Sequence, residues 1–412
     1  MRRLGYILPF LFPFLCIQSA KAQVSRIRQD FISYGFPRYE HNNMQVLPGG
    51  KTKFEALKKD IAKAKHYVHI EYYKWFNDSI GREMLDILAE RASQGGRVRL
   101  LYDAFGNSGK ESGLTKEFLQ EYRAKGVDNV GFDPMRFPYV NHALHRLHRK
   151  MVVIDGNVAY TGGLNVADYY IHGKPELGRW SDMHARLTGP IVAEYQSLFA
   201  DMWYRATKER LSASAYQSAD FLSVGNAVGG YEAFVVDREP GAKSKRIRQA
   251  YISCFDNAQR RVLVINPYII MVRSVRSALY RCIERGVDVE ILLGKKGDNL
   301  VSEVSTAREI RQLAKRGAKV WLCEQCFHHD KVMVVDDTLC TIGTANLDAR
   351  SLSFDYEVNA YYFSPEHCRE LESYFEEHRR SSIRLTEDNW KEIYPRSKRR
   401  LGWWLKGIRG IL

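Results

Sequence analysis

Two short segments of this chain carry the same set of chemically active residues. In the first, His148, Lys150 and Asp155 follow a His-x-Lys-x4-Asp pattern. An imidazole and an ammonium two positions apart on a strand point to the same side of a sheet. Such a pair can bind a phosphate oxygen and transfer a proton, so the pattern indicates phosphoryl-transfer chemistry.

The pattern is repeated at a constant distance along the chain. Each member recurs 181 positions later, together with a glycine and an asparagine that follow it. Two matched sets predict one site in which two histidines, two lysines and two asparagines surround a phosphate, with no metal and no cofactor. The repeated residues are His148, Lys150, Asp155, Gly162 and Asn165 in the first set, and His329, Lys331, Asp336, Gly343 and Asn346 in the second.

Around each set, the hydrophobic pattern alternates between helices and strands in the same order. Helices are predicted over residues 53–65, 80–93, 115–124, 247–258, 275–285 and 303–316. Strands are predicted over residues 67–73, 98–102, 149–154, 158–161, 261–268, 287–293 and 320–323. This order predicts an α/β fold of two similar α/β-sandwich halves, with mixed, largely parallel sheets flanked by helices, packed as a pseudo-dimer with one active site between them.

At these residues the chain resembles the phospholipase D superfamily, whose motif is His-x-Lys-x4-Asp followed by a Gly-rich turn and an Asn. The two copies read HRKMVVIDGNVAYTGGLN and HDKVMVVDDTLCTIGTAN. Further matches at residues 71–73, 266–268 and 343–351 resemble the bacterial cardiolipin synthase branch in particular. The resemblance extends from about residue 44 to residue 380.

The resemblance implies a two-step reaction through a phosphohistidine, with His148 as the nucleophile and His329 as the general acid and base. It also implies that an acidic residue orients each histidine. Asp155 and Asp336 belong to the catalytic motif, although each resembles a structural residue more than a catalytic one, in agreement with its position in a turn. The candidate site is therefore His148, Lys150, Asp155, His329, Lys331 and Asp336 as catalytic residues, Asp182 and Glu357 as His-orienting residues, and Asn165 and Asn346 as phosphate-binding residues.

The activity that the resemblance implies is a phosphatidyltransferase that makes cardiolipin from two phosphatidylglycerol molecules. A phospholipase D that hydrolyses phospholipids to phosphatidic acid and a metal-independent secreted nuclease remain open as alternatives. The net charge of +14 suits any anionic partner. An anionic membrane surface and phosphatidylglycerol are the expected partners, nucleic acid is not expected, and one chain is expected to act as a monomeric pseudo-dimer.

Residues 1–22 have the pattern of a secretory signal peptide. Arg2 and Arg3 precede an apolar run at 4–17, and small residues at 20 and 22 favour cleavage before Gln23. We therefore expect an exported protein, periplasmic and peripherally associated with the membrane. The alternative is an inner-membrane anchor, although the run is shorter than the about 20 residues that a bilayer requires.

The remaining boundaries follow from composition. The first half covers residues 44–211, a Ser-, Ala- and Gly-rich linker covers 212–230, the second half covers 231–380, and a basic, aromatic tail covers 381–412. In the tail, cations alternate with aromatic residues such as Trp403 and Trp404, which suits an interfacial helix on anionic lipid. The other interpretation is a tail that packs on the body with its charges solvated.

The chain contains seven cysteines, and cleavage would remove Cys16 and leave six. An even number in an exported protein permits disulfides. The contexts of Cys254, Cys282 and Cys340 are apolar, so buried free thiols are an equal expectation.

Cys323 and Cys326 lie just before His328 and His329, which invites a zinc interpretation. No second Cys/His pair stands at ligand spacing, and His329 is needed for the phosphoryl chemistry, so no metal is expected there.

Four other polar residues could serve in a site, and each has a simpler interpretation. His142 and His145 precede His148 at a spacing that could suggest a metal, but no carboxylate is placed to help, so a loop or groove lining is favoured. Asp103 and Asp298 follow strands and are interpreted as helix caps or turn residues.

Overall fold

The computed structural model describes residues 26–134, 144–211, 230–241 and 243–408. The predicted signal peptide, His142 and nearly all of the predicted linker lie outside these described residues. Within them, no helix combines the length and the apolar character that crossing a bilayer requires.

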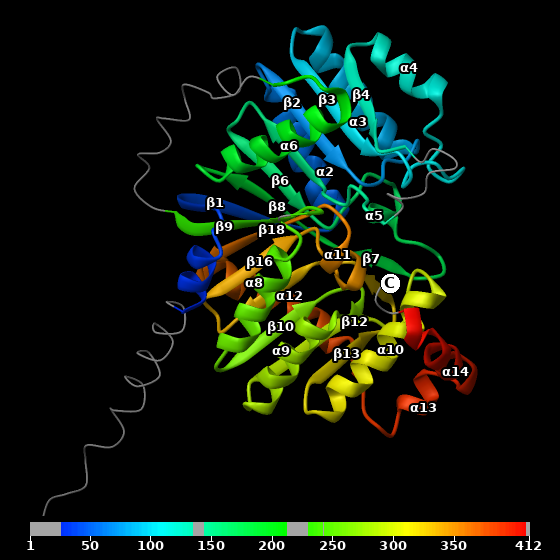
Figure 1. The fold of residues 1–412 in the computed structure, drawn as a ribbon. Coiled ribbons are helices and arrows are strands. Elements are labelled where there is room, and N and C mark those ends of the chain that lie inside the picture. The colour runs from blue at the N-terminus through cyan, green and yellow to red at the C-terminus, as the bar shows by residue number, and fades with distance from the viewer. Residues whose placement is uncertain (1–25, 135–143, 212–229, 242, 409–412) are drawn as a thin grey trace, which may run out of the picture.

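One 15-stranded sheet runs through both halves of the chain (Figure 1). The first half supplies seven neighbouring strands and the second half supplies eight, and the two sets join where β1 pairs antiparallel with β9. In spatial order the strands of the first half are β4 (Val127–Phe132), β3 (Arg97–Asp103), β2 (Tyr67–Tyr72), β5 (Met151–Ile154), β6 (Val158–Gly162), β8 (Met183–Thr188) and β1 (Arg38–Pro48). Those of the second half are β9 (Tyr231–Arg238), β18 (Glu357–Phe363), β16 (Leu339–Gly343), β15 (Val332–Val335), β10 (Arg261–Ile265), β12 (Asp288–Gly294), β13 (Lys319–Cys323) and β19 (Ser382–Arg384).

The two sets of strands follow the same plan, which confirms the predicted duplication and the α/β class. Parallel pairing is limited to β2–β3–β4 in the first half and β10–β12–β13 in the second. The other pairs in this sheet are antiparallel. The sheet is mixed as predicted, but most of its strand pairs are antiparallel and not parallel. The reason is that the strands that carry the motifs connect through tight hairpins rather than through crossover helices.

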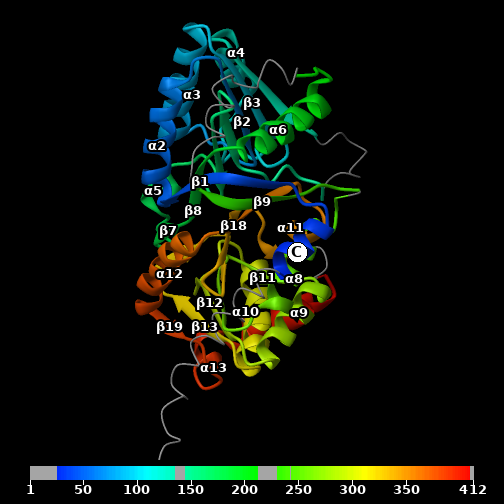
Figure 2. The same ribbon diagram turned by 90° about the vertical axis from the view of Figure 1, so that its left-hand side faces the viewer.

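Helices cover both faces of each half (Figure 2). Helices α2 and α3 lie on one face of the first half and α6 on the other, while α12 and the α8–α9 pair lie on opposite faces of the second half. One buried apolar cluster is continuous across both halves and joins α6 and α12 to the central strands, so it fixes the halves against each other. The helices are α2 (Gly49–Lys63), α3 (Ser79–Ser93), α4 (Lys116–Ala124), α5 (Tyr169–His172), α6 (Val192–Thr207), α8 (Arg246–Asn257), α9 (Arg273–Glu284), α10 (Leu300–Lys315), α11 (Ala349–Ser353) and α12 (Pro365–Arg380).

Two small sheets lie beside the large one. Strand β7 (Arg179–Ser181) of the first half pairs in parallel with β14 (Cys326–His328) of the second. Strand β11 (Ile269–Ile270) pairs with β17 (Leu347–Asp348). The β7–β14 pair thus ties the two halves together at a second place, directly before His329.

The tail packs against α10 and leaves two tryptophans in solvent. It forms α13 (Trp390–Ile393), α14 (Arg396–Trp404) and the short 3-10 helix η2 (Leu405–Ile408). Trp390 and Tyr394 are buried, and Lys398 Nζ lies 2.5 Å from Glu303 Oε1 on α10. Trp403 and Trp404 are 61% and 75% exposed. Packing on the body therefore describes the start of the tail, while its aromatic end remains open to a partner.

Candidate active site

Each motif histidine is held in place by the opposite half of the molecule. His148 stands before β5 of the first half, and its backbone N–H donates to the carbonyl oxygen of Tyr356 in the second half at 3.0 Å. His329 stands before β15 of the second half, and its N–H donates to the carbonyl oxygen of Ser181 in the first half at 2.7 Å. The interface between the halves therefore sets the position of both side chains.

The carboxylates that orient the histidines also come from the opposite half. The Nδ1 atom of His148 lies 2.6 Å from Oε1 of Glu357, and the Nδ1 atom of His329 lies 2.6 Å from Oδ2 of Asp182. A carboxylate beside Nδ1 holds the proton on that nitrogen, so Nε2 of each ring is left for the reacting group. The sequence indicated both carboxylates, and the structure adds that the pairing is crossed.

The surroundings of each carboxylate explain its fixed position. Glu357 accepts a hydrogen bond from the hydroxyl of Thr344 at 2.5 Å. Asp182 accepts one from the N–H of Met183 at 2.8 Å. A Cβ atom at Gly163 would lie 2.0 Å from Asp182 Oδ1, so only glycine at that position leaves room for the carboxylate.

Burial controls the charge of these groups. It lowers the pKa of His148 and of His329 well below the usual range, and the neighbouring lysines add to this effect. Burial also raises the pKa of Glu357 to about 7 and lowers the pKa of Lys150 to about 7. Both imidazoles are thus neutral at neutral pH, which is the form that a nucleophile requires.

The two histidines and the two motif asparagines line one pocket of about 510 Å³. Each motif lysine contacts its histidine: the Nζ atom of Lys150 donates to the carbonyl oxygen of His148 at 2.6 Å, and that of Lys331 lies 2.8 Å from Nδ1 of His329. An ammonium group has three donors, so this contact leaves others for an anion. Asn165 already uses its side-chain amide N–H toward the hydroxyl of Tyr170 at 2.9 Å. Phosphate binding by Asn165 and Asn346 remains a prediction.

Asp155 and Asp336 do not line the pocket. Each adopts a positive φ, 50° and 48°, in the turn at the far end of its motif strand. Each carboxylate accepts three backbone N–H bonds: Asp155 from Lys65, His66 and Tyr67, and Asp336 from Gln259, Arg260 and Arg261. Their place among the catalytic residues is therefore corrected, because their side chains fix the starts of β2 and β10 and do not face the reacting groups.

The pocket contains residues that were assigned no role from the sequence. Asp355 and Arg350 line it, with Arg350 Nη2 3.3 Å from Asp355 Oδ1. Tyr73 lies edge-on to His148, with ring centroids 4.9 Å apart, and Trp180 lies 5.4 Å from His329. Trp180, Arg350 and Asp355 lie within four positions of candidate site residues in the sequence. That closeness was the available signal, but it carries no information about where a side chain points.

Three of the remaining candidates can be placed. Asp103 is buried against Arg146 at 2.9 Å and accepts the N–H of Gly106, which confirms a turn residue. Asp298 lines the active-site pocket and accepts a hydrogen bond from Tyr268 at 2.6 Å, a location that the interpretation as a helix cap or turn residue did not include. His145 lines a separate pocket beside Phe132, in agreement with a groove lining.

Two histidines that share one pocket, each with a carboxylate and a lysine, define a phosphoryl-transfer site of the phospholipase D class. One chain builds it from two similar halves. The family described as "Cardiolipin synthase, PLD-like domain" matches residues 57–203 and 251–379. The chain belongs to this family, which confirms the resemblance.

Proteins with curated names show the same relationship. The chain is 34% identical over 346 residues to "Probable cardiolipin synthase YwiE" of Bacillus subtilis (strain 168), covering 84% of this chain and 67% of that protein. It is 35% identical over 340 residues to "Cardiolipin synthase" of Geobacillus kaustophilus (strain HTA426), covering 82% and 66%. For "Major cardiolipin synthase ClsA" of Bacillus subtilis (strain 168), identity is 35% over 353 residues, covering 85% and 72%. The chain thus spans about two thirds of the length of these relatives.

A solved structure shares the whole fold. The crystal structure of phosphatidylserine synthase from Haemophilus influenzae Rd KW20 aligns with a TM-score of 0.70 over 94% of this chain and 99% of that chain, at 17% identity. At this identity the likeness shows the fold and does not bear on the substrate.

Proposed function

We propose that this protein is a phosphatidyltransferase that joins two phosphatidylglycerol molecules into cardiolipin and releases glycerol. The observation that carries the proposal is the pair of histidines with crossed carboxylate partners at one pocket. The relatives named cardiolipin synthase support the choice of substrate.

In the first step, Nε2 of His148 attacks the phosphorus of one phosphatidylglycerol. A P–N bond forms, the P–O bond to the headgroup glycerol breaks, and His329 gives its Nε2 proton to the departing glycerol oxygen. The negative charge of a bound phosphodiester raises the pKa of the imidazole beside it, so substrate binding favours the protonated acid that this step needs. Lys150 and Lys331 stabilise charge on the non-bridging oxygens.

In the second step, His329 takes the proton from a primary hydroxyl of the second phosphatidylglycerol. The hydroxyl oxygen attacks phosphorus, the P–N bond to His148 breaks, and cardiolipin is released. Water at the same place would give phosphatidic acid, so the position of the incoming alcohol decides between transfer and hydrolysis. Asp298 and the aromatic rings of the pocket are placed to hold that alcohol.

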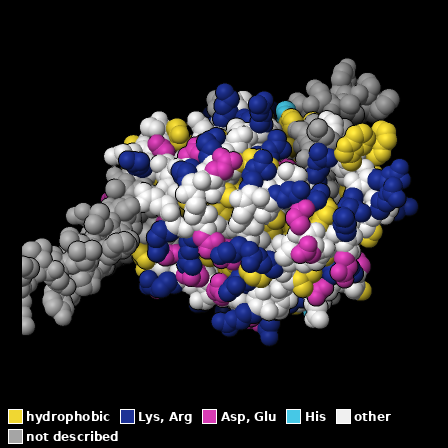
Figure 3. All heavy atoms as spheres, turned by 90° about the horizontal axis from the view of Figure 1, so that it is seen from below, with side chains coloured by type: hydrophobic (Ala, Val, Ile, Leu, Met, Phe, Trp, Pro, Cys, Tyr) yellow, Lys and Arg dark blue, Asp and Glu magenta, His cyan; other side chains and the backbone are white. Residues whose placement is uncertain are grey.

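Membrane contact is the second part of the proposal. Leu300 and Val301 at the start of α10 are exposed, and Val301 also lines the mouth of the active-site pocket. Helix α14 packs on α10, which brings the exposed Trp403 and Trp404 to the same end of the molecule. Lys and Arg side chains are spread over the face seen in Figure 3, with an apolar group at its edge. This combination favours an anionic membrane surface.

The reaction is tested with vesicles of phosphatidylglycerol, with and without a chelator, and products identified by mass spectrometry. Cardiolipin and glycerol in equal amounts are expected. Phosphatidic acid as the sole product would replace transfer by hydrolysis, and cleavage of added DNA with the lipid untouched would overturn the lipid substrate.

Membrane binding is tested by sedimentation with vesicles of phosphatidylglycerol or phosphatidylcholine. Changing Trp403 and Trp404 together to Ser is expected to weaken binding to the anionic vesicles by about tenfold or more, because two indole rings are lost from the interface. The control is Ile32→Ser, which removes a residue of similar exposure (51%) elsewhere. Equal binding by the wild-type protein, the double tryptophan variant and the Ile32→Ser control would rule out docking through the tail.

A further inference from the structure

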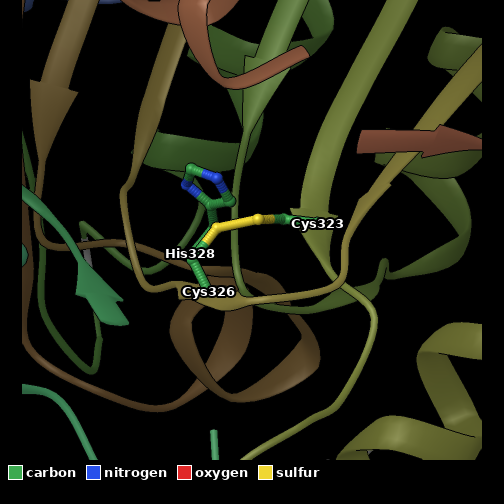
Figure 4. Close-up of side chains that lie close together, drawn as sticks. All are labelled: Cys323, Cys326 and His328. Atoms are coloured by element: carbon green, nitrogen blue, oxygen red, sulfur yellow. A yellow bond between two sulfur atoms is a disulfide. The ribbon is translucent and has the colours of Figure 1, made fainter. Parts of the chain in front are cut away.

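A compact group of metal-ligand side chains lies directly behind His329. Cys323 ends β13, Cys326 and His328 belong to β14, and their potential ligand atoms lie within 4.8 Å of one another. In the structure the two cysteines form a disulfide, with the imidazole of His328 beside it (Figure 4). A second imidazole, that of His378 on α12, meets the first: His378 Nδ1 lies 3.2 Å from His328 Nε2.

We propose that Cys323, Cys326, His328 and His378 form a structural zinc site when the two cysteines are reduced. Two thiolates and two imidazoles are a common tetrahedral ligand set for Zn²⁺. The sequence alone argued against a metal here, because only three of these residues are close together in it and His378 lies 50 residues beyond His328. The site is separate from the phosphoryl chemistry and does not depend on the proposed reaction.

Three of the four residues lie within reach of one ion, and the fourth, His378, contacts the imidazole of His328. Cys326 and His328 are alternate residues of one strand, so their side chains share a side. In the disulfide form the 3.2 Å between the two imidazole nitrogens is a hydrogen bond, and zinc binding would replace it by two Zn–N bonds. The Cα atoms of the cysteines are 5.6 Å apart, so side-chain rotation alone can separate the sulfurs.

The hydrogen bonds of His328 point to a ligand role. Its Nδ1 lies 2.9 Å from Oδ2 of the buried Asp330, and a carboxylate at this position holds the proton on Nδ1. The second nitrogen, Nε2, is then directed at His378. Zinc-bound histidines characteristically donate their other N–H to a carboxylate or carbonyl, so the orienting group of a metal site is already present.

The charges around the group suit a neutral complex. A dithiol reductant supplies two electrons and two protons to the disulfide and yields two thiols; Zn²⁺ then displaces both thiol protons. Two thiolates cancel the charge of the ion, which fits a group that is nearly fully buried. The charged side chains that face the group are Asp330 and Arg179, whose Nη2 lies 3.4 Å from His378 Nδ1. This guanidinium can donate to a thiolate once the histidine binds the ion.

The location gives the site a structural consequence. Strand β14 pairs with β7, and this pairing leads directly to the bond between His329 and the carbonyl oxygen of Ser181. An ion that joins β13, β14 and α12 would therefore brace the segment that delivers His329 to Asp182.

The test uses the full chain, reduced with a dithiol under anaerobic conditions, loaded with Zn²⁺ and desalted against a weak chelator. About one zinc per chain is expected by elemental analysis. Cys326→Ser and His378→Gln should each retain less than a tenth of it. Two matched controls, Cys282→Ala for a buried free thiol and His148→Gln for an active-site imidazole, should retain it in full. Asp330→Asn should weaken zinc binding about 10- to 100-fold.

A second measurement on the wild-type chain does not depend on any variant folding. Co²⁺ in place of zinc should give the visible absorption of a tetrahedral thiolate complex in the reduced protein and none in the oxidised protein. A reduced chain that retains no zinc, zinc retention unchanged by His378→Gln, or a cobalt spectrum without thiolate bands would each overturn the site and leave only the disulfide.

Discussion

His148 and His329 stand at matching places in the two halves, yet their neighbours differ. His148 has polar neighbours: a carboxylate oxygen of Asp355 lies within 4.8 Å of its ring nitrogen, Arg350 pairs with Asp355, and Tyr73 meets the ring edge-on. His329 is enclosed by rings, with centroids of Trp180, Phe327 and Tyr170 at 5.4, 6.0 and 6.1 Å.

The carboxylate contact that both rings share and the neighbours in which they differ have separate consequences. The bond from Nδ1 to a carboxylate is the same on both sides, so both rings are prepared to react through Nε2. The neighbours are unequal, so the two rings need not have equal roles. Charged groups beside His148 suit the phosphoryl group itself, while an aromatic wall beside His329 suits the carbon atoms of the leaving and entering glycerol.

The largest expected effect comes from removing either imidazole. His148→Asn and His329→Asn should each lower cardiolipin formation by about 10⁴-fold or more, because both steps need both rings. A phosphatidyl ester of nitrophenol separates the roles, since nitrophenolate leaves without a proton. With this substrate, nitrophenol release should recover by about 10²-fold or more in the His329 variant and not in the His148 variant. Recovery in the His148 variant alone would reverse the assignment.

The crossed pairs should give the next largest effect. Glu357→Gln and Asp182→Asn should each lower the transfer rate by about 10²- to 10⁴-fold, because an amide no longer holds the reactive tautomer of its histidine. Proton NMR of the ring N–H groups checks the partners: Glu357→Gln should move the Nδ1 proton signal of His148, and Asp182→Asn that of His329. Shifts in the uncrossed pattern would contradict the pairing.

The sequence predicted the elements of the site well and its assembly only in part. The helix expected over 303–316 is α10 at Leu300–Lys315, and the strand expected over 67–73 is β2 at Tyr67–Tyr72. Local periodicity determines such elements. The partner of His148, by contrast, lies 209 residues away, and that of His329 lies 147 residues away. The interface between the halves makes these pairs, and no local pattern encodes it.

The same limit explains the other surprises. No metal was expected at Cys323, Cys326 and His328, and the imidazole that contacts His328 could not be foreseen, because His378 belongs to a helix from a distant segment. The sequence also could not show that Trp390 of α13 would be buried while Trp404 of α14 stays exposed.

A change of pH should have a smaller effect, and it should act on the binding of an anion in the active-site pocket. Burial lowers the pKa of Lys150 to about 7 and raises that of Glu357 to about 7, so both groups favour a bound anion in their protonated forms. Binding of inorganic phosphate should be strongest below pH 7 and fall as pH rises, with proton uptake on binding near pH 7 in calorimetry. Lys150→Met should weaken binding and flatten this pH profile. Binding that strengthens with pH would show that neither group titrates as described.

The smallest effect on the reaction rate is expected from Asp155 and Asp336, at which the two halves are most alike. Asp155 and Asp336 each use one oxygen for two backbone N–H groups and the other oxygen for a third. In Asp155→Asn or Asp336→Asn, the amide must turn a donor toward an N–H, which costs about 1–3 kcal/mol of unfolding free energy. Because the two sites are in separate halves, the costs should add in the double variant.

The rate per folded molecule separates this structural role from a catalytic one. It should stay within about twofold of the wild-type rate in both variants, since neither carboxylate lines the pocket. Chemical denaturation measures the free energy of unfolding, and the vesicle assay measures the rate per folded molecule. A loss of rate by orders of magnitude with unchanged stability would return both aspartates to the catalytic set. Equal losses of stability at unchanged rate would instead show that the duplication conserves the framework under each histidine, while the surroundings of the rings have diverged.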